Sequence, residues 1–319
     1  MESSSPIAVY ALGGESPLSQ IARIREGLAA QPGVVLTDHP AKADLIYAND
    51  AGTHEAALCA GLRRPRATVM LNVLDIPEQL IPPAGDYTLD KLHTMLKRLE
   101  QADIVTAISP FVQSQLLRYT NSRSHVIWNP IKDVSPAKRL NGDRPYPQFR
   151  ALMAGRCRDR NKRFDSIGIP ALIMAGFEER EVAVVGGEYP GWGTDLGIVS
   201  DATLNDLYNS VDFVIQPTAL AGLELAPLEG MICGALPIIC YDMSTFGDLP
   251  YPRHWGCYPS ATSVAFRLRM LSDNPVIMEH DRQYAIEAGR GLSETLSKNA
   301  VAARIIELYR KMVQSSPSS

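Results

Sequence analysis

Short apolar runs, each the length of one strand, alternate along this chain with segments whose apolar residues recur at helical spacing. The run Ile7–Leu12 is the first expected strand, and the segment after it places Leu18, Ile21, Ile24 and Leu28 on one face of a helix. Such alternation predicts a parallel sheet with crossover helices, which is an α/β fold. In the first half we expect further strands at Val34–Leu36, Asp44–Tyr47, Thr68–Val73, Ile104–Ala107 and His125–Ile127, and a helix at about Thr88–Gln101.

A polar, proline-rich stretch from Lys132 to Gln148 interrupts the alternation. We interpret this stretch as a linker between two domains, because it also contains the turn signal Asn141-Gly142. The alternation then restarts, with a helix that Asp201 is expected to cap and a last helix from Asn299 to Val313. In this half we expect strands at Phe149–Met153, Glu181–Val185, Phe213–Gln216 and Leu236–Cys240.

The composition is typical of a globular protein of two ordinary domains, with 319 residues, 45% hydrophobic and 21% charged. A net charge of −4, without a strongly basic half, argues against a nucleic-acid binder. The 5 cysteines follow no CxxC spacing, which favours reduced thiols over a disulfide frame or a zinc site. No signal peptide or apolar run long enough for a membrane span is evident, so we expect a cytoplasmic protein.

Cations follow the first strand expected in the second half. Gly155-Arg156 ends that strand, and Lys162 comes six residues after Arg156. A diphosphate leaving group carries about two negative charges, and its departure requires preorganised cations beside it. Arginine offers a planar fork to phosphate oxygens and lysine a mobile point charge. The segment therefore has the chemistry of a phosphate-binding loop, and the alternative from these residues alone is a basic loop that is simply solvated.

The stretch LAGLELAPLEGMICGALPII, residues 220–239, combines glycines with two carboxylates in an apolar context. A glycine-rich turn that enters a helix exposes backbone N–H groups and a positive dipole end, which suit the phosphates of a nucleotide. Glu229 follows one turn later and can accept hydrogen bonds from the paired hydroxyls of a sugar. A carboxylate in such apolar surroundings is costly unless it is hydrogen-bonded, which favours a functional role.

These segments resemble the signatures of the retaining, nucleotide-sugar-dependent glycosyltransferases of the GT-B fold. AGRCRDRNKRFD is similar to the family's G-R-x(5)-K-G, and residues 220–239 to E-G-F-G-L-x-x-L-E-A-M-x-x-G-x-P. VVGGE and VSDATLNDLYNSVDFVIQPT resemble further elements, so the ordered motifs cover roughly 150–240. The chain also departs from the family's pattern. Ala221 replaces its first glutamate, Glu224 and Arg163 each replace a glycine, Leu74 replaces a histidine, and HVIWNPI has a proline in place of a glycine.

The resemblance implies two Rossmann-like, doubly wound parallel-sheet domains that face a cleft. Residues 1–140 would form the acceptor domain and residues 141–298 the donor domain, while the helix 299–319 would cross back to the first domain. It also implies a retaining hexosyl- or pentosyltransferase that requires no metal and no cofactor. The substrate partners would be a nucleotide sugar, such as a UDP- or GDP-sugar, and an acceptor hydroxyl.

In this resemblance Arg156 and Lys162 carry the catalysis by stabilising the departing diphosphate. Glu229 would pair with the ribose, and Glu224 is either a substitute for the missing glutamate or a solvated loop residue. Asp75 would lie on the acceptor side. The residues expected to bind the donor are Gly13, Gly14, Gly155, Gly186, Gly222, Leu223, Glu224, Leu225 and Glu229.

Two alternatives remain open from the sequence. A degenerate homologue would bind nucleotide or glycan without catalysis, which the loss of the first glutamate and the histidine favours. A transferase that glycosylates hydroxymethylated pyrimidines in phage DNA is the other, although the nearly neutral first half argues against it. The acceptor could thus be a glycan, a lipid, a small molecule or a modified DNA base.

Overall fold

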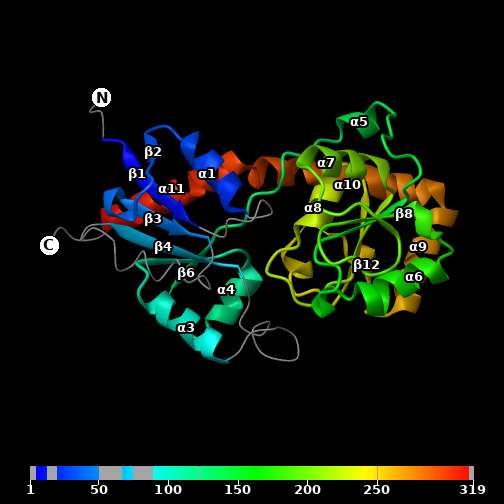
Figure 1. Ribbon diagram of the computed structural model, residues 1–319, viewed down its shortest axis with the longest axis horizontal. Helices are drawn as coiled ribbons and strands as arrows, with labels where there is room; N and C mark the ends of the chain where they lie inside the picture. Colours follow the sequence, from blue (N-terminus) through cyan, green and yellow to red (C-terminus); the bar gives the residue numbers. More distant parts are fainter. Residues whose placement is uncertain are drawn as a thin grey trace. The chain divides into compact units, whose positions relative to one another are not determined.

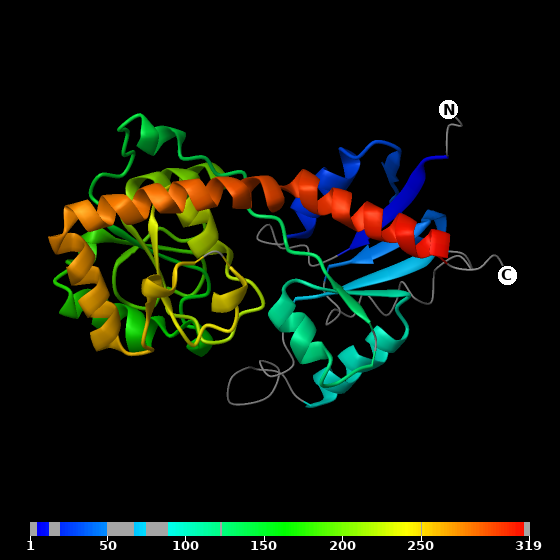
Figure 2. The ribbon, with the colours of Figure 1, turned by 180° about the vertical axis from the view of Figure 1, so that it is seen from behind.

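The computed structural model describes residues 5–12, 20–49, 67–74, 89–121, 123–249 and 251–315, without the side chains of 89–92. The chain divides into two compact units. The first contains residues up to Pro130 and the C-terminal part from Thr295, and the second runs from Ile131 to Glu294. Each unit contains a six-stranded parallel sheet with helices on both faces, so the predicted doubly wound α/β architecture is confirmed (Figures 1 and 2).

The strands of the first unit are β1 (Ile7–Leu12), β2 (Val34–Leu36), β3 (Leu45–Ala48), β4 (Thr68–Val73), β5 (Ile104–Ala107) and β6 (Ser124–Val126). Its helices are α1 (Ile21–Ala29), α3 (Leu89–Glu100), α4 (Pro110–Leu116), α11 (Lys298–Ser315) and the 3₁₀ turn η1 (Pro40–Lys42). The strand order is β2-β1-β3-β4-β5-β6. Helices α1 and α11 cover one face of this sheet, and α3 and α4 cover the other (Figure 1).

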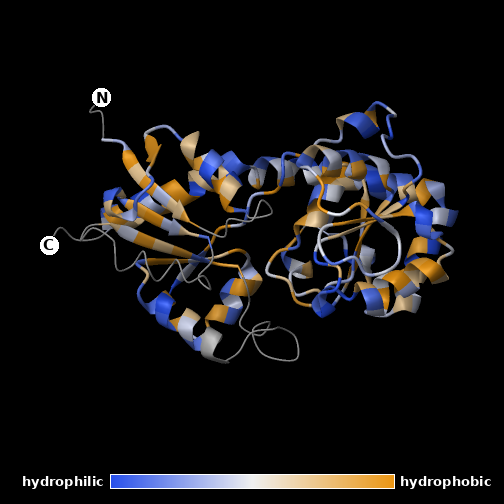
Figure 3. Ribbon diagram, in the orientation of Figure 1, coloured by the Kyte–Doolittle hydropathy of each residue, from blue (hydrophilic) through white to orange (hydrophobic). Residues whose placement is uncertain are grey.

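Helix α11 contributes to the core of the first unit from the far end of the sequence. It packs against α1, and the contact is close at Gly27, where a Cβ atom would lie 2.2 Å from the carbonyl oxygen of Lys298. The strands are coloured mostly as hydrophobic and the helices as banded in Figure 3, as expected for a buried parallel sheet. The buried side chains that α11 adds to this core are Val301, Ala302, Ile305 and Ile306.

The strands of the second unit are β7 (Ala151–Ala154), β8 (Val182–Val185), β9 (Thr194–Asp195), β10 (Phe213–Gln216), β11 (Leu236–Cys240) and β12 (Gly256–Cys257). Its α-helices are α5 (Ala137–Leu140), α6 (Ile169–Met174), α7 (Asp201–Ser210), α8 (Leu225–Ile232), α9 (Ala261–Asp273) and α10 (Pro275–Thr295). Its short turns are η3 (Arg160–Lys162), η4 (Phe164–Gly168), η5 (Glu179–Glu181), η6 (Phe246–Asp248) and η7 (Arg253–Trp255).

The order of the second sheet, β12-β11-β10-β7-β8-β9, reverses between β7 and β10. The chain adds β8 and β9 on one side of β7, then returns to the other side and adds β10, β11 and β12. The loops that follow β7 and β10 therefore leave the sheet in opposite directions at its carboxyl edge. In open α/β sheets ligands bind at such a reversal point.

The structure also corrects three local expectations. Helix α7 is capped by Ser200, whose hydroxyl accepts from the amide of Thr203 at 3.1 Å, while Asp201 is its first helical residue. The expected linker from Lys132 to Gln148 belongs to the second unit and contains α5. The sequence does not predict helices α9 and α10. It also does not predict the edge strands β9 and β12, because these two-residue strands lack an apolar run of normal strand length.

Candidate active site

The candidate site lies within the second unit, at the carboxyl edge where β7 and β10 are neighbours. Two loops meet there, one from Gly155 to Arg163 and one from Pro217 to Glu224. The first loop contains Arg156 and Lys162, and the second contains the start of the segment 220–239 that the sequence singled out. The fold therefore brings together residues about sixty positions apart in the sequence, as Lys162 and Glu224 are.

Glycines 155 and 186 allow the ends of β7 and β8 to approach closely. Gly155 has φ +127° and Gly186 has φ +116°, which side chains rarely permit. A Cβ atom on Gly186 would lie 2.3 Å from the carbonyl oxygen of Gly155. The backbone conformation at these two predicted site positions, Gly155 and Gly186, thus requires glycine.

Arg156 is a largely exposed cation at the end of β7. Its side chain is 76% exposed, and its one ion pair among the described residues is with Asp159, at 3.3 Å. Asp159 also accepts from the amide of Asn161 at 3.0 Å, which caps η3. The guanidinium therefore stands in solvent beside the carboxyl edge of the sheet, available to an anionic ligand.

Arg163 fastens the first loop to the second. Its guanidinium forms a two-pronged ion pair with Asp242, at 2.7 and 2.8 Å, and its Nε donates to the carbonyl of Pro217 at 2.5 Å. The backbone of Arg163 is left-handed, with φ +54°. This conformation explains why the motif has a glycine at this position, and the ion pair with Asp242 compensates for the side chain in its place.

Asn161 and Ser244 hold the second loop in place. The Asn161 side chain accepts from the amide of Leu220 at 2.9 Å and donates to the carbonyl of the same residue. The Ser244 hydroxyl is 2.8 Å from both the amide nitrogen and the carbonyl oxygen of Ala221. Ala221, which stands where the family has a glutamate, is buried and fixed by its backbone.

The turn that enters α8 presents unoccupied hydrogen-bond donors. Within the described ranges, the amides of Gly222, Leu223 and Leu225 have no acceptor. These amides precede or begin α8, at the positive end of its dipole. The predicted donor-binding amides thus form a surface suited to an anion.

Lys162 and Glu224 form an ion pair at 2.5 Å between the two loops. Their side chains are 16% and 10% exposed, respectively. The other carboxylate oxygen of Glu224 accepts from the side-chain amide of Gln216 at 3.1 Å. Of the two roles left open for Glu224, the solvated loop residue is therefore wrong.

Glu229 is buried on α8, with 2% of its surface exposed. One carboxylate oxygen accepts from the backbone amide of Lys132 and the other from the hydroxyl of Tyr208, both at 3.0 Å. Burial raises the pKa of Tyr208 well above its usual value, and Glu229 raises it further, so the hydroxyl stays protonated and donates. Glu229 thus joins the beginning of the second unit to α7 and α8.

Cys157 lies next to Arg156 but is not a nucleophile. Burial raises the pKa of its thiol to about 11, although nearby Lys162 acts in the opposite direction. The thiol is therefore neutral near pH 7. Among the described residues, no group of three or more His, Cys, Asp and Glu could hold a metal ion.

Gly13, Gly14 and Asp75, which the sequence assigns to the donor and acceptor sides, lie outside the described residues. Four residues at the site were missed by sequence reasoning: Asn161, Gln216, Asp242 and Ser244. Their one sequence signal is position, since each lies at the carboxyl end of a strand or in the loop that follows it. The partners of Asn161, Asp242 and Ser244 are far away in the sequence, so only the fold reveals those contacts.

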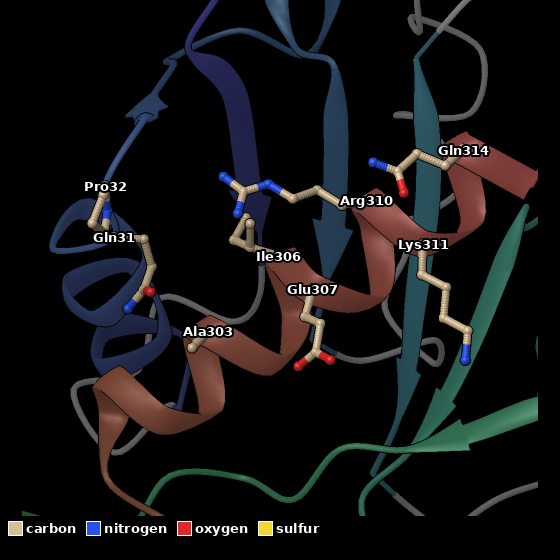
Figure 4. A pocket seen from close by; sticks show the side chains of 8 residues that line it. All are labelled: Gln31, Pro32, Ala303, Ile306, Glu307, Arg310, Lys311 and Gln314. Carbon is tan, nitrogen blue, oxygen red and sulfur yellow. The ribbon is translucent and has the colours of Figure 1, made fainter. Parts of the chain in front are cut away.

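A pocket of about 550 Å³ lies elsewhere, in the first unit (Figure 4). It extends from the loop between α1 and β2, at Gln31 and Pro32, along α11 to Gln314. That loop precedes β2 and so lies at the amino edge of the first sheet, away from the carboxyl ends where ligands bind. None of the residues proposed for the site lines this pocket.

None of the helices within the described ranges has both the length and the apolar character needed to cross a membrane. No protein-family model matches the chain, and no curated protein matches it either. Solved structures do match its fold.

Sucrose-phosphate synthase from Thermosynechococcus elongatus superposes with a TM-score of 0.67 at 18% identity, over 86% of this chain and 75% of that chain. HepE from Anabaena, solved with UDP and glucose, gives 0.69 at 14% identity, over 95% and 99%. A glycosyltransferase from Rickettsia africae ESF-5 gives 0.63 at 12% identity, over 98% and 100%. The chain therefore has the GT-B fold of these glycosyltransferases, as its motifs predict.

Proposed function

We propose that this GT-B protein transfers a sugar from a nucleotide-diphosphate donor to an acceptor hydroxyl. The observation that carries the proposal is the meeting of Arg156, Lys162 and the unoccupied amides of Gly222, Leu223 and Leu225 at the reversal point of the second sheet. Cations, free N–H donors and a helix N-terminus at one edge are what a diphosphate requires.

In the proposed mechanism the donor diphosphate lies against the turn before α8. Arg156 and Lys162 neutralise the charge that develops on the diphosphate as the bond to the sugar breaks. The acceptor hydroxyl attacks from the face that the diphosphate leaves and gives its proton to the leaving phosphate. The anomeric configuration is therefore retained, and no side-chain nucleophile is needed, which agrees with the neutral thiol of Cys157.

Glu229 is proposed to bind the ribose of the donor. The proposal rests on its place in the motif of residues 220–239. The bonds to Lys132 and Tyr208 would hold the carboxylate in a fixed orientation for the ribose hydroxyls. Gly13, Gly14 and Asp75 keep their proposed roles in the first unit, on the donor and acceptor sides.

UDP-sugars are the first donors to test, because HepE was solved with UDP-glucose and the pneumococcal transferase GtfA with UDP and GlcNAc. GDP-sugars remain candidates, as do both hexosyl and pentosyl groups. We propose a cytoplasmic location on the sequence evidence of reduced cysteines.

A panel of UDP-, GDP-, ADP- and dTDP-sugars in a thermal-shift assay tests donor binding. The matching donor stabilises the protein by about 2.7 kcal/mol at 100 times its Kd, which raises the melting temperature. Stabilisation by none of these compounds would contradict the proposal. Binding without turnover across many acceptors would favour the non-catalytic homologue instead, and a salt-dependent shift of modified DNA would favour the DNA acceptor.

Arg156→Ala is expected to reduce sugar transfer by about 10²–10³-fold, because it removes a cation from the departing diphosphate. The measurement is kcat/KM with the donor found in the panel. Arg158→Ala is the matched control, since Arg158 is on the same loop but donates to the carbonyl of Tyr189 at 3.0 Å. Equal activity of the Arg156→Ala and Arg158→Ala variants would remove Arg156 from the mechanism.

We also propose that the sugar transfer needs no metal ion and retains the anomeric configuration of the donor. Transfer measured after dialysis against EDTA should equal transfer with added Mg²⁺ or Mn²⁺, because the cations of the protein stabilise the leaving group. NMR of the product should show the anomeric configuration of the donor. Loss of activity in EDTA that Mg²⁺ restores, or an inverted product, would each refute that part of the mechanism.

A further inference from the structure

The charge at the site is partly cancelled before any ligand arrives. Lys162 is one of the two cations proposed to bind the diphosphate, yet its ammonium already contacts the carboxylate of Glu224 at 2.5 Å. Both side chains are largely buried, so water screens this ion pair weakly. Before any ligand binds, the ammonium of Lys162 is therefore already paired with the carboxylate of Glu224.

Glu224 is held in this position from a second side. The amide nitrogen of Gln216 donates to its other oxygen at 3.1 Å and to the hydroxyl of Thr218 at 2.8 Å. A carboxylate only accepts hydrogen bonds, so it fixes the orientation of the amide. The amide oxygen of Gln216 is consequently buried without a hydrogen-bond partner in the described part of the chain.

Glu224 also has the surroundings that suit a ligand anion. It is the residue directly before α8, where the helix dipole favours negative charge. The unoccupied amides of Leu223 and Leu225 are its neighbours in the chain. A phosphate bound at this turn and the carboxylate of Glu224 would share the same lysine and the same helix end.

From these contacts we propose that Glu224 is an internal counter-ion that competes with the diphosphate for Lys162. The competition lowers the affinity of the site for the nucleoside diphosphate and so favours release of that product after transfer. This inference rests on the proposed function, because it concerns the same phosphate site. It assigns Glu224 a role in setting nucleotide affinity.

The test is calorimetric titration of the wild type and its variants with UDP. Glu224→Gln keeps the shape of the side chain and removes its charge, so it should bind UDP about tenfold more tightly than the wild type. Glu224→Gly, a second variant that costs little at a helix N-cap, should also bind more tightly. In a Lys162→Met background the effect of Glu224→Gln should disappear.

Asp206→Asn is the matched control. Asp206 is also a carboxylate of an ion pair in the second unit, but it lies on α7, its partner is Lys138 of α5 at 2.7 Å, and neither residue is assigned to the proposed site. Its UDP affinity should stay within about twofold of the wild type. Melting temperatures of all variants show whether each is folded.

Unchanged or weaker UDP binding by folded Glu224→Gln and Glu224→Gly would overturn the inference, since Glu224 would then position Lys162 or act only structurally. The same tightening in Asp206→Asn would also overturn it, because the effect would then come from the general loss of a negative charge. If the wild type binds neither UDP nor any other nucleoside diphosphate, the proposed function itself fails. The two failures are therefore distinguishable.

Discussion

Individual backbone conformations shape the site as much as its charged side chains do. Arg163 and Gly186 both have positive φ values, 54° and 116°. At Arg163 the cost of the left-handed conformation, about 1–2 kcal/mol, is offset by the ion pair with Asp242 and the bond to Pro217. At Gly186 no side chain could be accommodated, because its Cβ atom would lie only 2.3 Å from the carbonyl oxygen of Gly155.

Gly186→Ala should therefore destabilise the protein by at least about 2 kcal/mol, through backbone strain and a clash with Gly155. Denaturant unfolding measures the loss, and nucleotide binding should weaken with it because the loop of Arg156 must move. Gly187→Ala is a matched control, since a Cβ there would meet nothing within 4 Å. Equal stability of the two variants would contradict the close approach of the ends of β7 and β8.

The elements around the site are positioned by close packing of α8 on the sheet. Gly230 lies on α8, where a Cβ would approach Val214 of β10 to 2.5 Å. The helix can therefore lie close to the strand, with its first residue, Leu225, at the carboxyl edge. The sequence showed a glycine here, but the reason for it is a contact with a strand sixteen residues earlier in the sequence.

Gly230→Ala is expected to destabilise the protein by about 1–3 kcal/mol through overpacking, although alanine is the better helix former. Gly291→Ala in α10 should do the reverse and stabilise by about 0.5–1 kcal/mol, because nothing lies within 4 Å of its Cβ position. Urea unfolding of both variants checks the pair. A stabilising Gly230→Ala would show that α8 does not pack this closely.

At the scale of the molecule, the first unit is discontinuous in sequence. Its last helix, α11, follows the whole second unit and contributes four buried side chains to the core of the first. Burial of such side chains contributes about 1.5–3 kcal/mol for each larger one, while a domain is stable by only about 5–15 kcal/mol in total.

Truncation after Glu294 should consequently unfold the first unit. Far-UV circular dichroism and proteolysis would show loss of structure in residues up to Pro130, whereas residues 131–294 should resist protease. A truncated protein whose first unit melts like that of the full chain would show that α11 is dispensable for its core.

The sequence alone determined the class of fold and the segments that carry the chemistry. Hydrophobic period is a local property, so strands such as Thr68–Val73 and Phe213–Gln216 were predicted with their observed bounds. Edge strands as short as Thr194–Asp195 gave no such signal. The GT-B fold likewise followed from local motifs, and the same motifs are the basis for proposing Arg156 and Lys162 as phosphate-binding cations.

Only the tertiary structure decided how those segments act on one another. The ion pair of Lys162 with Glu224 and that of Arg163 with Asp242 each join loops far apart in the chain. Such contacts depend on the order of strands in the sheet, which brings the ends of β7, β10 and β11 to one edge. Local sequence pattern does not record that order, so the sequence identified the charged groups and the fold decided which of them are free.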